Sequence, residues 1–120
     1  MWAALQYYGL GANQVNLSIY GDAGGIPGSL LAGPTTVANL PDAGPCCTLA
    51  IANFTPLPVT GGTRYWVVAN APLTGQGSDF VGVWDWDYKI MLFGGTNGVN
   101  GWFGENADTL PAGEVLGTIP

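Results

Sequence analysis

Two carboxylates, Asp85 and Asp87, stand two residues apart in a segment rich in apolar and aromatic residues. In an extended strand this spacing puts both side chains on one face, roughly 7 Å apart. Inverting glycosidases use carboxylate pairs about 6.5–9.5 Å apart, so a glycosidase is one hypothesis. A calcium site is a second, because calcium prefers carboxylate and carbonyl oxygens. The favoured interpretation is a solvated strand face on which Lys89 partly balances the two acids.

A third carboxylate, Asp22, opens the glycine-rich stretch Asp22–Gly28. It has the same two interpretations, because Asp is a calcium ligand and also a turn residue that bonds its own backbone. Turn chemistry is the favoured interpretation. The sequence therefore predicts no cofactor, with calcium at Asp22, Asp85 and Asp87 as the alternative.

Cys46 and Cys47 are the two cysteines of the chain, and they are adjacent. Disulfides usually join Cα atoms about 4.4–6.8 Å apart, whereas neighbouring Cα atoms lie about 3.8 Å apart, so a vicinal bond is strained. The favoured interpretation is an oxidised vicinal pair that stiffens its loop, with free thiols and bridges to other chains as alternatives. A zinc site would need further Cys or His ligands, and the sequence has none.

Tryptophan rings are the remaining candidates for binding, because flat rings can stack on sugars. Trp84 and Trp86 would share one face of a strand, so they are either both core residues, which is the favoured interpretation, or both part of a platform. Trp102 stands between glycines and is the ring most readily exposed. Trp66, in a strongly apolar run, is predicted to be a core residue. The candidate ligand-binding residues are thus Trp84, Trp86 and Trp102.

The charge composition excludes several functions. The chain has 2 Lys and Arg against 8 Asp and Glu, a net charge of −6, and so lacks the clustered cations that bind phosphates. No apolar run approaches the roughly 20 residues that span a bilayer. The absence of His removes the ordinary catalytic triad and a proton shuttle at neutral pH. We predict a non-enzymatic protein with no nucleic-acid partner and no transmembrane segment.

The elements that position these residues are predicted to be short strands. Val15–Tyr20 alternates apolar and polar residues, and Arg64–Ala69 is rich in aromatic and β-branched residues. Thr35–Leu40 is predicted to be an edge strand bounded by prolines. The 20 Gly and 9 Pro interrupt every window that could form a helix. We expect one domain over residues 1–120, an antiparallel, jelly-roll-like β-sandwich of about eight short strands without significant helix.

Three further elements are predicted in the second half of the chain. Phe80–Asp87 is expected to form one strand, Gly94–Gly98 a turn, and Val115–Ile119 the closing strand.

The stretch Val15–Ala32 reads VNLSIYGDAGGIPGSLLA. It resembles the L-Y-x-D-x-G-G-x-P-G-x-x-L-A signature of secreted bacterial β-sandwich domains that occur with PEP-CTERM or other choice-of-anchor sorting tails. Pro45–Thr48, Val59–Val68 and Leu110–Thr118 fit the same pattern in the same order. The resemblance implies a β-sandwich at an extracellular or cell-surface location. It says little about activity, because the family is largely uncharacterised.

The chain opens inside that pattern, without the first strands and the secretion signal that the resemblance implies. We therefore expect an N-terminally incomplete sandwich in which the strand before Gly21–Gly28 lacks a neighbour. Another chain would fill the gap, by dimerisation, strand donation or filament assembly. The predicted function is a structural or assembly module that forms homo-oligomers or accepts a donated strand. A carbohydrate-binding module, with or without calcium, is the alternative, and a small glycosidase is a third.

Overall fold

The structure of the chain is a computed structural model. It describes residues 1–9, 11–44, 49–71, 82–84, 86–91, 94–96, 102–104, 108–111 and 113–117, and for 82–114 it gives strands and their pairing. The described residues form strands and connections without a helix, which confirms the prediction of an all-β chain. All strand pairings among them are antiparallel. This part of the chain has no helix long and apolar enough to cross a membrane.

The described strands are short except for two. They are β1 (Trp2–Ala3), β2 (Leu5–Tyr7), β3 (Gln14–Asp22), β4 (Pro27–Ala38), β5 (Ala50–Ile51), β6 (Tyr65–Asn70), β7 (Gly82–Trp84), β8 (Trp86–Met91), β9 (Gly94–Thr96), β10 (Trp102–Gly104), β11 (Asp108–Pro111) and β12 (Gly113–Glu114).

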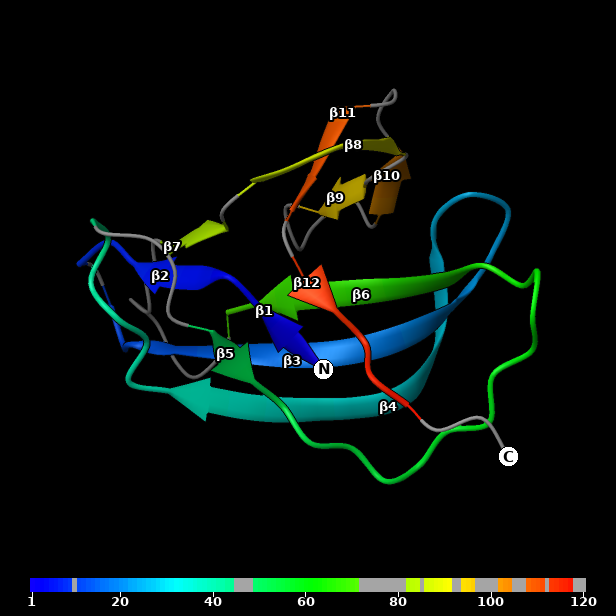
Figure 1. Cartoon of the computed structure of the whole chain (residues 1–120), viewed down its shortest axis with the longest axis horizontal. Helices are drawn as coiled ribbons and strands as arrows, with labels where there is room; N and C mark the ends of the chain where they lie inside the picture. The colour runs from blue at the N-terminus through cyan, green and yellow to red at the C-terminus, as the bar shows by residue number, and fades with distance from the viewer. Residues whose placement is uncertain are drawn as a thin grey trace.

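The largest sheet has the order β4-β3-β6 (Figure 1). Its central strand is β3, which pairs with β4 on one side and with β6 on the other. The alternation that predicted a strand over Val15–Tyr20 is present, and Val15, Leu17 and Ile19 are all buried. The expectation that this strand lacks a neighbour is wrong, because both of its backbone edges are paired.

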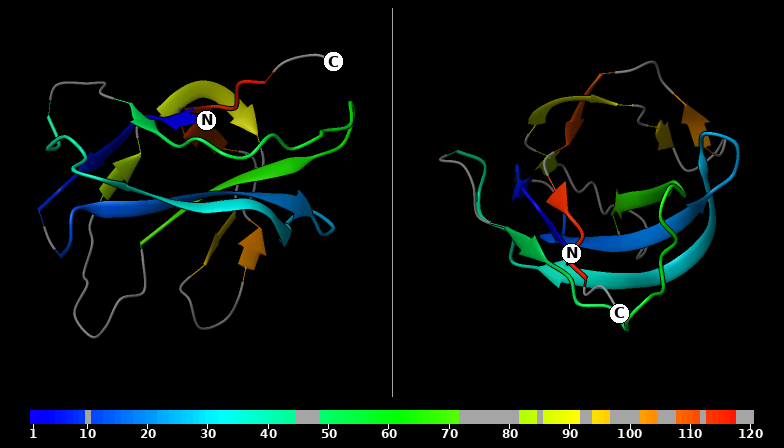
Figure 2. Two further views of the ribbon diagram at one scale, coloured as in Figure 1. Left: turned by 90° about the horizontal axis from the view of Figure 1, so that it is seen from below. Right: turned by 45° about the vertical axis from the view of Figure 1, so that its right-hand side comes forward.

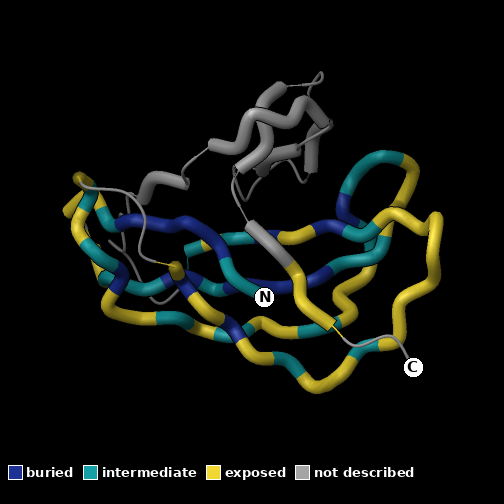
Figure 3. The backbone as a smooth tube through the Cα atoms, in the orientation of Figure 1, coloured by how far each residue is buried: buried dark blue, intermediate teal, exposed yellow. Residues whose placement is uncertain are grey.

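A second sheet, of order β12-β1-β5, lies over one face of β3 (Figures 1 and 2). The core lies between the two sheets, where Val15 and Leu17 meet Ala3 and Ala50. Buried residues follow β1, β2 and β3, while β4 and the segment after β5 are largely exposed (Figure 3). Small side chains on β1 and β5 let that sheet approach β3 closely.

The strand β4 is an edge of its sheet, as predicted for Thr35–Leu40, but it is longer than predicted. It begins at Pro27, and Pro34, which was expected to bound the strand, lies inside it. The pairing with β3 shifts register three times, each time with extra residues on β4. Proline is tolerated at an edge or a bulge, and Pro34 lies at both.

Gly33 shows why the first of these bulges needs glycine. Its φ is +93°, in the region that residues with a Cβ avoid. A Cβ built on Gly33 would lie 2.8 Å from the Leu17 carbonyl oxygen and 3.1 Å from Ser18 Cα. The backbone of β4 therefore presses against the central strand at this residue.

The second half of the chain differs from prediction at three places. The segment expected to form one strand over Phe80–Asp87 gives two, β7 paired with β2 and β8 paired with β11. The expected turn at Gly94–Gly98 begins with strand β9. The closing strands are β11 and β12, while residues 115–117 lie outside any strand.

Candidate functional site

The turn between β3 and β4 brings one carboxylate against Trp66 of β6 and against Arg64, which directly precedes that strand. Asp22 ends β3, and Gly24 and Gly25 follow with φ of +74° and +97°. These left-handed residues turn the chain back toward Pro27, where β4 begins. The Ala23 N–H donates to the Ile26 carbonyl at 2.9 Å and closes the turn.

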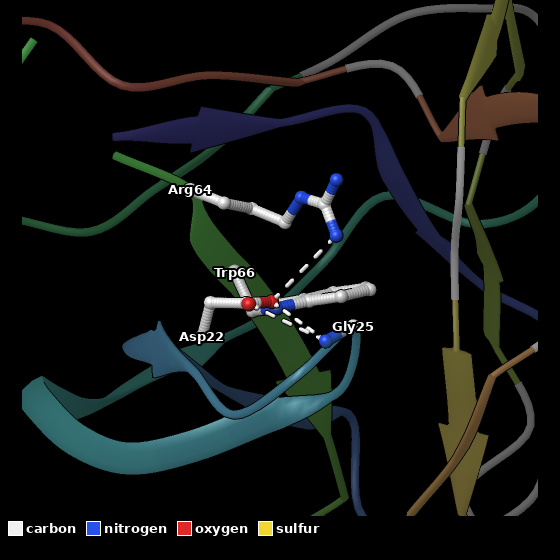
Figure 4. Close-up of polar contacts among 4 residues, drawn as sticks. All are labelled: Asp22, Gly25, Arg64 and Trp66. Carbon is white, nitrogen blue, oxygen red and sulfur yellow. Dashed lines mark hydrogen bonds and ion pairs between the residues drawn. The ribbon is translucent and has the colours of Figure 1, made fainter. Parts of the chain in front are cut away.

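The Asp22 carboxylate accepts one hydrogen bond from within the turn and another from the neighbouring strand β6 (Figure 4). The indole N–H of Trp66 donates to Oδ1 at 2.7 Å, and the Gly25 N–H lies 3.2 and 3.3 Å from the two oxygens. Arg64 Nη1 lies 3.8 Å from Oδ1. Asp22 thus satisfies the indole N–H of Trp66, which is buried as predicted for a core residue.

The hydrogen bond from Trp66 lowers the pKa of Asp22 below its ordinary value of 3.8, and desolvation opposes it. The backbone N–H groups of Gly25 and Gly24 and the Arg64 guanidinium also lower this pKa. All of these groups favour the carboxylate over the acid. Arg64 is about half exposed, so its share is weakened by solvent and salt.

Asp22 should therefore make folding stability depend on acid pH. Its pKa is lower in the folded state than in the unfolded state, so its stabilising effect is present above about pH 3.8 and is lost as the pH falls through the folded-state pKa. The Tm difference between wild type and Asp22→Asn should be largest between about pH 5 and 7 and shrink toward pH 2.5. Thermal unfolding across this range measures it.

The control for this experiment is Asp42→Asn, which removes one negative charge at an exposed residue. Its Tm difference from wild type should be smaller at neutral pH. If Asp22→Asn matched the Tm of wild type throughout, the carboxylate would not stabilise the turn.

The predicted metal and redox residues fall in different parts of the chain. Asp22 is described, and its oxygens face N–H donors and Arg64. Asp87 is placed in β8, and Asp85, Cys46 and Cys47 lie outside the described residues. Where side chains are described, no three acidic or cysteine residues gather in a way that could hold a metal ion.

The predicted ring platform is divided between strands. Trp84 belongs to β7, Trp86 to β8 and Trp102 to β10. Trp84 pairs with Leu5 and Trp86 with Pro111, so the two residues expected on one strand belong to different sheets. Glycan binding by these residues stays a prediction.

A groove that the sequence analysis missed opens on the core face of the large sheet. Along β3 and β6 the residues facing the core continue from Leu17 and Ala69 to Ile19 and Val67. Beyond that point lies the groove, an open concavity with a volume of about 360 Å³. It is lined by Ile19, Val59, Thr60, Gly61, Gly62, Thr63, Tyr65, Val67 and Val115.

One side of the groove is a turn held in place by hydrogen bonds. The Thr63 N–H donates to the Thr60 carbonyl at 3.2 Å, and the Thr60 N–H donates to the Tyr65 hydroxyl at 2.9 Å. The Thr-Gly-Gly-Thr turn is readable in the sequence, and so is the alternation of Tyr65 and Val67. That the two meet around a groove depends on how far the covering sheet extends, which local sequence does not reveal.

Comparison of the chain with known protein families, with curated proteins and with solved structures gave no match.

Proposed function

We propose that the protein is a non-enzymatic, extracellular structural module that assembles by pairing the edge of β4 with a strand of a second copy. The two sheets that enclose its core are compatible with a jelly-roll-like sandwich of the secreted bacterial kind. The scarcity of Lys and Arg and the resemblance of Val15–Ala32 support the location. The observation that carries the proposal is the long edge of β4.

The part of this edge that can pair with another strand is its second half, residues 35–38. Asn39 N–H donates to the Asn13 carbonyl, so Asn39 faces β3 with its backbone. Backbone groups alternate sides along an antiparallel strand. Because the pairing from Asn39 to Thr35 is regular, the backbone groups of Thr36 and Ala38 face away from β3. In the described part of the chain, β4 has no strand on that side.

The two halves of β4 differ in how they are protected. Natural edge strands avoid pairing with other chains through bulges, prolines and charged residues. The half before Thr35 has three register shifts and Pro34, so it is poorly shaped for a new strand. Residues 35–38 have neither, and no charge occurs anywhere in β4. A second copy can therefore pair there without bringing like charges together.

The test is the mass in solution of wild type and Thr36→Pro. Proline removes the outward N–H at residue 36 and leaves the hydrogen bonds of Val37 and Thr35 to β3 in place. We expect the wild type to exceed the 12.4 kDa of one chain in size exclusion with light scattering, and Thr36→Pro to run at one chain's mass.

The matched control is Thr36→Val. Both substitutions remove the hydrogen bond that the Thr36 hydroxyl donates to Asn16 at 2.8 Å, but valine keeps the backbone N–H. Thr36→Val should assemble like wild type. A wild type that stays monomeric at high protein concentration, or an assembly unchanged by Thr36→Pro, contradicts the proposal.

A further inference from the structure

The groove beside Val67 continues the core beyond the part that the described strands of the second sheet cover. Its floor is Ile19, which is buried, whereas Val59, Val67 and Val115 around it are large apolar residues left exposed. Apolar side chains gathered around a concavity mark a binding site more often than scattered ones do. We infer that this groove binds a small, uncharged, mainly apolar molecule.

The charges of the site define the first property of the ligand. Among the nine described residues that line the groove, none is Asp, Glu, Lys or Arg. The ion pair of Arg64 with Asp22 belongs with Trp66, which faces the other side of β6 from Tyr65 and Val67. A charged ligand would lose its hydration in the groove without meeting an opposite charge, which is costly. The ligand is therefore uncharged.

The size of the groove defines the second property. Its volume of about 360 Å³ is in the range of known ligand pockets. It is more than twice that of the roughly 150 Å³ apolar cavity that binds benzene. A molecule of two or three rings, or an alkyl chain of similar volume, fits this space.

The same numbers argue against a protein partner. A stable protein interface uses about 20–30 residues on each side. The described residues that line the groove are nine, and four of them form the single turn from Thr60 to Thr63. A second copy at the groove would bury too little surface to stay bound. The inference is also independent of the assembly role, since no lining residue belongs to β4.

The groove is shaped before the ligand arrives. The hydroxyl of Tyr65 holds the Thr60–Thr63 turn through the Thr60 N–H, so the turn does not have to be ordered on binding. Preorganised sites lose less conformational entropy when a ligand binds. The hydroxyl and the turn backbone also give the groove a polar rim, which suits a ligand with one hydrogen-bonding group.

The test uses N-phenyl-1-naphthylamine, an uncharged apolar probe whose fluorescence rises when it leaves water. We expect wild type to bind one probe per chain. Val115→Asp should weaken binding at least tenfold, because it puts a carboxylate at the groove in a segment outside any strand. Leu116→Asp is the matched control, since Leu116 is 65% exposed and does not line the groove, and it should bind like wild type.

A second variant fills the space instead of charging it. Val67→Trp suits a strand and should occupy the groove with its own ring, so that probe binding falls while thermal unfolding stays cooperative. Absence of probe binding by wild type would overturn the inference. The inference would also be overturned if Val115→Asp and Leu116→Asp weakened probe binding equally. Unchanged probe binding in both Val115→Asp and Val67→Trp would overturn it as well.

Discussion

Replacing Leu17 with alanine should lower the free energy of unfolding by about 3–5 kcal/mol. Leu17 is 0% exposed in the central strand, and it belongs to the core between the two sheets. Alanine would leave a cavity between β3 and the sheet that contains β1. Because a domain of this size is stable by only about 5–15 kcal/mol, the loss would be a large share of the total.

Urea unfolding of wild type and Leu17→Ala measures this loss as a lower midpoint. Leu116→Ala is the matched control, because it removes the same atoms from an exposed side chain and should change stability by no more than about 0.5 kcal/mol. If Leu17→Ala and Leu116→Ala lowered the free energy of unfolding equally, the core would not lie between β1 and β3.

The sequence predicts well those strands whose own residues carry a clear strand pattern. The alternation of Val15, Leu17 and Ile19 persists in β3, and the aromatic and β-branched run gives β6. Both strands lie in the largest sheet, so local preference and tertiary packing agree. The turn after Asp22 was also predictable, because Asp bonds its own backbone in turns and Gly adopts the positive φ that a tight turn needs.

The strands that the sequence predicts poorly depend on partners far along the chain. Val115 and Leu116 begin a segment that was predicted to be the closing strand, yet both are exposed and lie outside any strand, whereas β12 just before them pairs with β1. Pro34 resembles a boundary, but the bulge against Leu17 accommodates it inside β4. Which segment meets which edge is a property of the assembled sheets.

The same limit applies to the candidate sites. Asp22 was singled out from its turn, but its hydrogen bond to Trp66 spans 44 residues. The groove requires Ile19, Val67 and the Thr60–Thr63 turn at once, and only their placement in the fold brings them together. Residue types alone had pointed to carboxylates and tryptophans, whereas this site is made of valines and a turn.

Replacing Gly33 with alanine should destabilise the protein by about 3 kcal/mol or more, because two costs add. A φ of +93° is unfavourable for any residue with a Cβ, at about 1–2 kcal/mol. The new methyl group would also lie 2.8 Å from the Leu17 carbonyl oxygen, which is backbone in the central strand and cannot move without shifting β3. Thermal unfolding should show a Tm lower by on the order of 10 °C.

Two other glycines separate these costs. Gly24 has a φ of +74° with no atom near its would-be Cβ, so Gly24→Ala should show the backbone cost alone, about 1–2 kcal/mol. Gly61 has neither a positive φ nor a close atom, so Gly61→Ala should be nearly neutral. Gly61→Ala is therefore expected to be the most stable of the three variants, Gly24→Ala the next and Gly33→Ala the least stable. If Gly33→Ala lowered the stability no more than Gly24→Ala, the backbone of β4 would not lie in close contact with Leu17 at Gly33. The bulge that limits the open edge to residues 35–38 would then not be at this position.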